Sequence, residues 1–252
     1  MPASGTGGHL TCHRESRYPV AVLTLRGDLT EASAAIARDC MIKALIDQPT
    51  ALVVDLDGVR HTADAAGLAV FGAVARHAAQ WPGTTVMVCG GHPDLRRRIR
   101  DVAGSSPLEI FPNHAEAVAA ADARPVPRRC RLACGTEADA PARARRIATA
   151  VFRRWHVPEE LIGRAVLIIS EFVANAVRHA RTRSDLMLHL KDRRLHIAVR
   201  DTSRRLPRVQ PQSDLDHEDG RGLGIVGRLA ASWGVVADSD GKVVWAAICC
   251  RP

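Results

Sequence analysis

The stretch Ile168-Ile-Ser-Glu-Phe-Val-Ala-Asn-Ala-Val-Arg-His-Ala180 carries Glu171 and Asn175 within an amphipathic helical pattern. Glu171 and Asn175 are four residues apart, so one helix face presents a carboxylate and a carboxamide. A carboxamide oxygen can hold Mg²⁺ on a nucleoside triphosphate, and a carboxylate one turn earlier can deprotonate or orient the hydroxyl or water that attacks the γ-phosphate. Taken alone, the pair is more typical of a solvated polar stripe on an amphipathic helix.

Two later segments change this interpretation. A strand-like run, Leu195 to Val199, is followed by Arg200-Asp201-Thr202-Ser203, and Asp219-Gly-Arg-Gly-Leu-Gly-Ile-Val226 opens an apolar helix pattern with closely spaced glycines. An aspartate at a strand end can accept a hydrogen bond from the adenine amino group. Glycines before a helix let backbone N–H groups approach phosphates at the positive end of the helix dipole. A lone glycine-rich turn is weak evidence, so the order and spacing of the three segments carry the interpretation.

Together the three segments resemble the N, G1 and G2 boxes of the Bergerat-fold ATPase superfamily, which includes gyrase and histidine kinases. They look most like its small anti-sigma-factor serine kinases. The resemblance covers about residues 130–252 and implies a two-layer α/β sandwich that binds ATP and Mg²⁺. It implies that Glu171 is the catalytic base, Asn175 the Mg²⁺ ligand, Asp201 the adenine contact, and Gly222 and Gly224 the phosphate-loop glycines.

Two features near the second box qualify this likeness. The fuller superfamily pattern has glycine where Ser203 stands, and a residue with a Cβ does not adopt positive φ cheaply. The adenine pocket therefore departs from the family pattern at this position. The segment from Arg204 to Asp219 is rich in Arg, Pro, Gln and Asp, and the resemblance makes it a lid over the phosphates; its plainer interpretation is a mobile surface loop.

The first half of the chain alternates strand and helix patterns, which predicts an α/β domain over residues 18–122. Strands are expected at residues 20–25, 51–56 and 84–89, and helices at residues 30–47, 65–79 and 94–102. Thr30 is a predicted helix N-cap, and Asn113-His114-Ala115-Glu116 predicts the start of a last helix.

This half resembles a STAS domain, the fold of anti-sigma-factor antagonists. The likeness rests on Gly27-Asp28-Leu29 after the first strand, and on Asp55-Leu56-Asp57-Gly58-Val59 before Asp64-Ala65-Ala66-Gly67-Leu68. In phosphorylated members of that family a serine follows the aspartate at a helix N-terminus. Ala65 occupies that position here and has no hydroxyl to accept a phosphoryl group, so the resemblance implies a STAS domain that is not phosphorylated at this site.

The segment Ala123 to Arg129 contains two prolines separated by one residue and is predicted to be a linker between the domains at 18–122 and 130–252. Beyond the linker, Pro141 is placed to begin one helix, and Pro158 with its following glutamates to begin the long helix that carries Glu171 and Asn175.

The net charge of the 252-residue chain is +8, and it arises in the second half because the first 125 residues are close to neutral. A basic surface attracts polyphosphate, acidic proteins or nucleic acid, but no zinc-finger, RRM or recognition-helix pattern accompanies the charge, so no direct nucleic-acid binding is expected. The seven cysteines lack zinc-site spacing. Their odd number, with no secretory segment and no long apolar run, predicts a reduced cytoplasmic protein without a membrane span.

These observations lead to two expectations about function. The first is a Mg²⁺- and ATP-dependent serine/threonine protein kinase of the anti-sigma-factor type, fused to a non-phosphorylatable STAS module. The resemblance implies that its partners are a sigma factor or a serine-bearing STAS antagonist, in a partner-switching system that also allows a homodimer. The alternative is a non-catalytic ATP-binding protein that sequesters such a partner. Glu171 favours the enzyme, whereas Ser203 and the missing acceptor at Ala65 favour the alternative.

Overall fold

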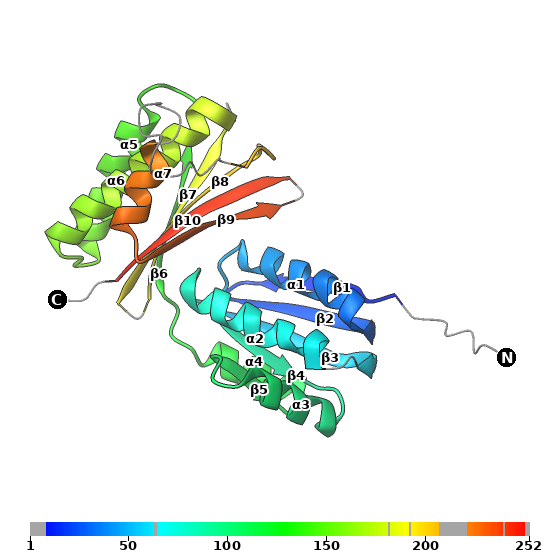
Figure 1. The fold of residues 1–252 in the computed structure, drawn as a ribbon. Helices are drawn as coiled ribbons and strands as arrows, with labels where there is room; N and C mark the ends of the chain where they lie inside the picture. Colours follow the sequence, from blue (N-terminus) through cyan, green and yellow to red (C-terminus); the bar gives the residue numbers. More distant parts are fainter. Residues whose placement is uncertain are drawn as a thin grey trace. The chain divides into compact units, whose positions relative to one another are not determined.

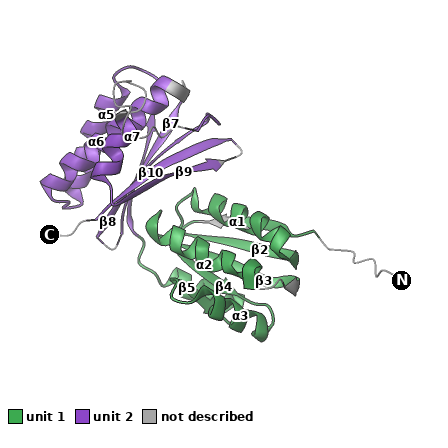
Figure 2. Cartoon of the chain, in the orientation of Figure 1, with its two compact units in different colours: residues 1–126 green, residues 127–252 purple. Residues whose placement is uncertain are grey.

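The computed structural model describes residues 9–62, 65–180, 182–191, 193–206, 221–238 and 240–249. The chain divides into two compact units, residues 1–126 and residues 127–252 (Figure 2). Each unit is built on its own five-stranded sheet (Figure 1). The α/β class expected from the sequence is confirmed for both units.

The sheet of the first unit has the strand order β1-β2-β3-β4-β5. Strands β2 to β5 are parallel, and β1 is an antiparallel edge strand beside β2. The strands are β1 (Thr11–Arg17), β2 (Val20–Leu29), β3 (Ala51–Thr62), β4 (Thr85–Cys89) and β5 (Leu108–Phe111). The helices are α1 (Glu31–Leu45), α2 (Ala65–Gln80), α3 (Pro93–Ala103) and α4 (His114–Asp122).

Two helices of this unit begin at the predicted N-caps. The backbone N–H of Ser33 donates to Oγ1 of Thr30 at 3.2 Å before α1. The backbone N–H of Glu116 donates to Oδ1 of Asn113 at 2.9 Å before α4. Each bond satisfies one N–H group that has no partner within its own helix. The sequence therefore identified both helix starts correctly.

Helices cover both faces of the first sheet. Side chains alternate along each strand, so α4 packs on a face that is formed by Val20, Ala51, Val53, Met87 and Cys89. The opposite face, which includes Leu52, Val54 and Val86, is covered by α1, α2 and α3 (Figure 1). The carboxyl ends of the central strands therefore open between these two helical layers.

The second unit is a two-layer sandwich, as the sequence implied. Its antiparallel sheet has the order β6-β7-β8-β10-β9, and the helices lie on one face of that sheet (Figure 1). The strands are β6 (Arg128–Cys134), β7 (Ser184–Lys191), β8 (Arg194–Asp201), β9 (Ser232–Asp238) and β10 (Gly241–Cys249). The helices are α5 (Ala140–Arg154), α6 (Glu159–Asn175), a π-helical turn η1 (Ala176–Ala180) and α7 (Arg221–Leu229).

Several elements differ from the sequence expectation. β1 was not predicted, because an exposed edge strand such as Thr11–Arg17 needs no alternation of apolar residues. β3 continues past Leu56 to Thr62 beside β2. Arg128 and Arg129, which the sequence placed in the linker, are the first residues of β6. Among the described helices, none combines the length and the apolar character needed to cross a membrane.

Candidate functional site

The α6 helix carries two of the residues singled out in the sequence. Its buried face is apolar and packs into the core of the second unit with residues that include Ile168, Ile169 and Phe172. Glu171 and Asn175 are only half-buried. The amphipathic pattern therefore fixes the rotation of the helix and keeps these two polar groups away from the apolar core.

Glu171 reaches the first turn of α7. A Cβ atom built on Gly222 would lie 2.4 Å from Oε2 of Glu171, so the carboxylate is packed against the bare Cα of Gly222. Gly222 is the second residue of α7, where helix N–H groups lack intrahelical partners and the helix dipole is positive. The glycine thus allows a carboxylate to approach a helix terminus that also suits phosphate.

Asn175 is the last residue of α6 and is followed directly by the π-helical turn η1. Single π-helical turns often occur at functional sites. Nη2 of Arg178 donates to Oδ1 of Asn175 across 3.5 Å, at the long limit for a hydrogen bond, and Arg178 is exposed. The carboxamide oxygen is therefore held only weakly, and a hard cation such as Mg²⁺ prefers oxygen donors of this kind.

Asp201 ends β8 and is almost completely buried. Its Oδ1 accepts two hydrogen bonds, from Nζ of Lys242 at 2.8 Å and from the backbone N–H of Ser203 at 2.8 Å. Nζ of Lys242 also donates to the carbonyl oxygen of Ser203 at 3.1 Å. Because Lys242 and Asp201 are opposite each other on neighbouring strands, the sheet register itself brings the two charges together.

Sequence reasoning did not identify Lys242 as a site residue. It belongs to β10, the last strand of the chain, in which the sequence motifs placed no site residue. The signal that could have identified it is a lysine within an apolar strand, because a buried lysine usually has a charged partner. Its side chain is 7% exposed, and that of Asp201 is 4% exposed.

The sequence also singled out Ser203, Gly224 and the segment from Arg204 to Asp219. Ser203 is not among the non-glycine residues with positive φ in the described part of the chain, which are Gln48, His156 and Arg193. Its Cβ therefore causes no backbone strain there. Gly224 lies in α7, and a Cβ on it would meet no atom within 4 Å. The proposed lid from Arg204 to Asp219 lies outside the described residues beyond Leu206.

In the first unit, Ala65 is the first residue of α2 and is exposed. Asp64, which precedes it, lies outside the described residues. The position to which the resemblance assigns the serine of phosphorylated STAS relatives is therefore exposed and holds a methyl group.

Comparison with known families gives one match in each half of the chain. Residues 13–117 match the STAS domain, and residues 135–248 match the histidine kinase-like ATPase domain. Both are the families that the sequence motifs resemble. Among curated proteins, none matches the chain at a significant level.

Solved structures that align with parts of this chain include an anti-sigma factor antagonist from Mycobacterium paratuberculosis, with 23% identity over 45% of this chain and 94% of that one, at a TM-score of 0.39. The RsbU and RsbW domains of Rv1364c from Mycobacterium tuberculosis are 17% identical over 50% of this chain and 33% of that one, at a TM-score of 0.40. The histidine kinase domain of the blue-light activated kinase EL346 from Erythrobacter litoralis is 18% identical over 86% of this chain and 94% of that one, at a TM-score of 0.30. The family matches, rather than these distant structural ones, identify the halves: the chain joins a STAS domain to a histidine kinase-like ATPase domain.

Proposed function

We propose that the protein is a Mg²⁺- and ATP-dependent serine/threonine protein kinase of the anti-sigma-factor type that acts by partner switching. The observation that carries this proposal is the approach of Glu171 to Gly222 at the N-terminus of α7. The approach brings a candidate base to a helix end that suits phosphate. The match to an ATPase domain supports ATP as the nucleotide.

In this proposal the phosphates of ATP lie at the first turn of α7, close to Gly222 and Gly224. Asn175 supplies a carboxamide oxygen to Mg²⁺, which would neutralise charge on the phosphates. Asn175 suits the metal because its Oδ1 has only a long contact with Arg178. Gly222 suits the phosphates because it has no Cβ, which lets Glu171 approach the start of α7. Binding then requires Arg178 to release the carboxamide.

The chemical step transfers a phosphoryl group to the partner and a proton to Glu171. The hydroxyl oxygen of a seryl or threonyl partner forms a bond to the γ-phosphorus, and the bond from that phosphorus to the β–γ bridging oxygen breaks. Glu171 accepts the hydroxyl proton, and ADP leaves with the bridging oxygen. A base of this kind typically contributes about 10²–10⁴-fold to the rate.

In this arrangement Asp201 binds the adenine ring of ATP. Lys242 and the Ser203 N–H both bind Oδ1, so we assign Oδ2 to the amino group of adenine. The two bonds on Oδ1 orient the carboxylate before nucleotide arrives, and such preorganisation reduces the cost of binding. Lys242 therefore acts as a positioning residue for the adenine contact.

The partners in this scheme are a sigma factor and a serine-bearing STAS antagonist, of which the antagonist is the phosphoryl acceptor. The cis STAS domain bears Ala65 at its acceptor position, so it would act as a docking or inhibitory module. A homodimer of the kinase domain is compatible with the scheme.

A second function is favoured by a specific observation. The side chains proposed to hold Mg²⁺ and adenine already have cationic partners, Asn175 with Arg178 and Asp201 with Lys242. A protein that binds ATP only to set its affinity for a partner would tolerate this arrangement and would not need Glu171 as a base.

Incubation of the full chain with labelled ATP, Mg²⁺ and a panel of serine-bearing STAS proteins separates the two functions. Label on a seryl hydroxyl of a partner supports the kinase. Tight, nucleotide-dependent partner binding without transfer supports the non-catalytic protein, and the absence of any ATP binding contradicts both.

A further inference from the structure

Three side chains with metal-binding atoms meet at the carboxyl end of the parallel strands in the STAS domain. Asp55 and Cys89 are opposite each other and form the last residue pair between β3 and β4. His114 is the first residue of α4, the helix that covers this face of the sheet. One ligand atom from each residue lies within 4.8 Å of the other two. Ligand sites in open parallel sheets commonly lie at this edge.

We propose that Asp55, Cys89 and His114 form a binding site for a divalent cation of the zinc type. Thiolate, imidazole and carboxylate are the donors that Zn²⁺ uses, and three protein ligands leave its fourth tetrahedral position open for water or another ligand. The thiol argues against Mg²⁺ or Ca²⁺, which prefer oxygen donors. The His114 side chain is 46% exposed and gives the site an opening to solvent.

Hydrogen bonds from the backbone orient the carboxylate toward this site. Oδ1 of Asp55 accepts from the N–H of Asp57 at 2.9 Å, while Oδ2 faces Nδ1 of His114 at 3.2 Å. One oxygen is thus held by the protein, and the other points to the imidazole. Such supporting bonds are typical of metal ligands, whose orientation they fix.

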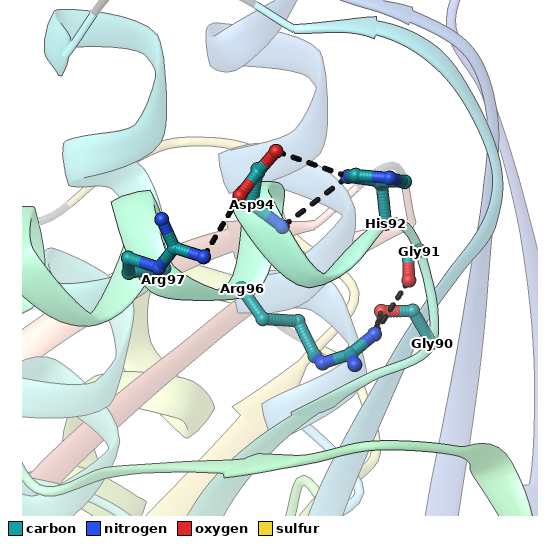
Figure 3. Close-up of polar contacts among 6 residues, drawn as sticks. All are labelled: Gly90, Gly91, His92, Asp94, Arg96 and Arg97. Atoms are coloured by element: carbon teal, nitrogen blue, oxygen red, sulfur yellow. Dashed lines mark hydrogen bonds and ion pairs between the residues drawn. The ribbon is translucent and has the colours of Figure 1, made fainter.

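The loop after Cys89 is held in the same way. Oδ1 of Asp57 accepts from the N–H of Gly91 at 2.8 Å, and the guanidinium of Arg96 donates to the carbonyl oxygens of both Gly90 and Gly91 (Figure 3). Gly90 has a φ of +72°, and a Cβ on it would lie 2.4 Å from Oδ1 of Asp57. Only glycine fits there without strain. The hydrogen bond between Asp57 and Gly91 links the part of β3 after Asp55 to the loop after Cys89.

The charges around the three residues also suit a cation. The carboxylates of Asp55 and Asp57 lie near Cys89, and a divalent cation would offset them. Cys89 would bind such a cation as thiolate and release its proton to solvent.

The plainer interpretation is an ion pair between His114 and Asp55 at the start of α4. It accounts for two of the three residues and gives Cys89 no role beyond filling space in the core. The two interpretations differ in one measurable property, because only the metal site predicts a bond between Cys89 and an added metal.

The test uses the full chain, freed of metal with a chelator, kept reduced and titrated with Co²⁺ in excess Mg²⁺. We expect one equivalent to bind with a thiolate-to-cobalt charge-transfer band and tetrahedral visible bands, all removed by Zn²⁺. Cys89→Ser should abolish the charge-transfer band. His114→Ala changes an exposed side chain, so it should leave folding intact and weaken Co²⁺ binding by at least ~10-fold, the loss that follows removal of even a supporting partner.

Cys40→Ser is the matched control. Cys40 lies beside Cys12 in the same unit, and these two thiols are the other place in this unit where Co²⁺ could bind sulfur. The proposal requires this variant to bind Co²⁺ as the wild type does. It is overturned if no charge-transfer band forms, if the band persists in Cys89→Ser, or if Cys40→Ser removes it. It is equally overturned if His114→Ala binds Co²⁺ with unchanged affinity.

Discussion

Nζ of Lys242 lies 2.8 Å from Oδ1 of Asp201, and the two side chains form a buried ion pair between neighbouring strands. Such a pair contributes less to stability than its charges suggest, because both groups lose their hydration. It does hold the Asp201 carboxylate in one orientation, which matters for a residue proposed to bind adenine. The pair thus links the stability of the ATPase domain to its proposed adenine site.

Removal of one partner from this pair should be costly. Lys242→Met leaves Asp201 buried without its cation, and we expect the free energy of unfolding to fall by about 3–5 kcal/mol. The double variant Lys242→Met/Asp201→Asn should recover part of that loss, because the uncompensated charge is gone. Urea unfolding of the wild type, the single variants Lys242→Met and Asp201→Asn, and the double variant gives the coupling energy through a double-mutant cycle.

The exposed pair of Arg131 and Asp185, between β6 and β7, is the control for this cycle. Their side chains are 65% and 33% exposed, so solvent screens them and the coupling should be at most about 1 kcal/mol. Equal coupling in the two pairs would show that burial does not strengthen the Lys242–Asp201 interaction.

Three glycines in helices should respond differently to replacement by alanine. Gly163 and Gly224 have open space where a Cβ would stand, so each alanine should stabilise its helix by roughly 0.5–1 kcal/mol. Gly222→Ala must displace the Glu171 carboxylate. A displacement of about 1 Å in a catalytic group costs on the order of 10²-fold in rate.

We therefore expect Gly222→Ala to lower phosphoryl transfer by about 10²-fold, Gly224→Ala to weaken ATP binding, and Gly163→Ala to leave both unchanged. Thermal unfolding measures the stability, calorimetry with Mg²⁺-ATP the affinity for ATP, and a transfer assay the rate of phosphoryl transfer. If Gly222→Ala and Gly163→Ala transfer equally fast, the contact between α7 and Glu171 has no catalytic meaning.

Asn175→Ala should weaken binding of ATP in the presence of Mg²⁺ by about tenfold or more, which corresponds to ~1.4 kcal/mol. In the absence of Mg²⁺ the variant and the wild type should bind ATP alike, because the side chain contacts the metal. Arg178→Ala is the control, since it removes the hydrogen-bond partner of Asn175 and leaves the carboxamide in place. Calorimetry that finds Asn175→Ala unaffected with Mg²⁺ would remove this residue from the site.

Ala65→Ser should create a phosphoryl acceptor at the exposed start of α2. Ala66→Ser, one residue further along the same helix and also exposed, is the control that should remain unlabelled. Mass spectrometry over a concentration series distinguishes transfer within one chain, which is independent of dilution, from transfer between chains. A kinase that labels a separate antagonist but not this serine would show that the cis STAS domain is no longer a substrate.

The sequence predicted those parts of the fold that depend on local chemistry. Thr30 and Asn113 were recognisable as helix caps, and the apolar run Ala51 to Leu56 as a buried strand, because each follows from its own residues. The spacing of Glu171 and Asn175 likewise predicted a shared helix face. The edge strand β1 carries no such pattern and forms because β2 offers it hydrogen bonds.

Long-range relationships could not be predicted. The pairing of Lys242 with Asp201 depends on the β8–β10 register, and the approach of Glu171 to Gly222 depends on how α6 packs against α7. The meeting of Asp55, Cys89 and His114 requires two strands, β3 and β4, and the start of helix α4 to come together. None of these contacts leaves a signal in neighbouring residues, because each arises from tertiary packing.

The central claim is that Glu171 is the base of a phosphoryl transfer to a seryl hydroxyl. Single-turnover transfer from labelled Mg²⁺-ATP to a serine-bearing STAS antagonist tests it, in the wild type and in Glu171→Ala. We predict transfer in the wild type and a loss of ~10²-fold or more in the variant, with ATP affinity nearly unchanged. Equal transfer rates in the two proteins, or no transfer from a wild type that binds ATP and the antagonist, would contradict the claim.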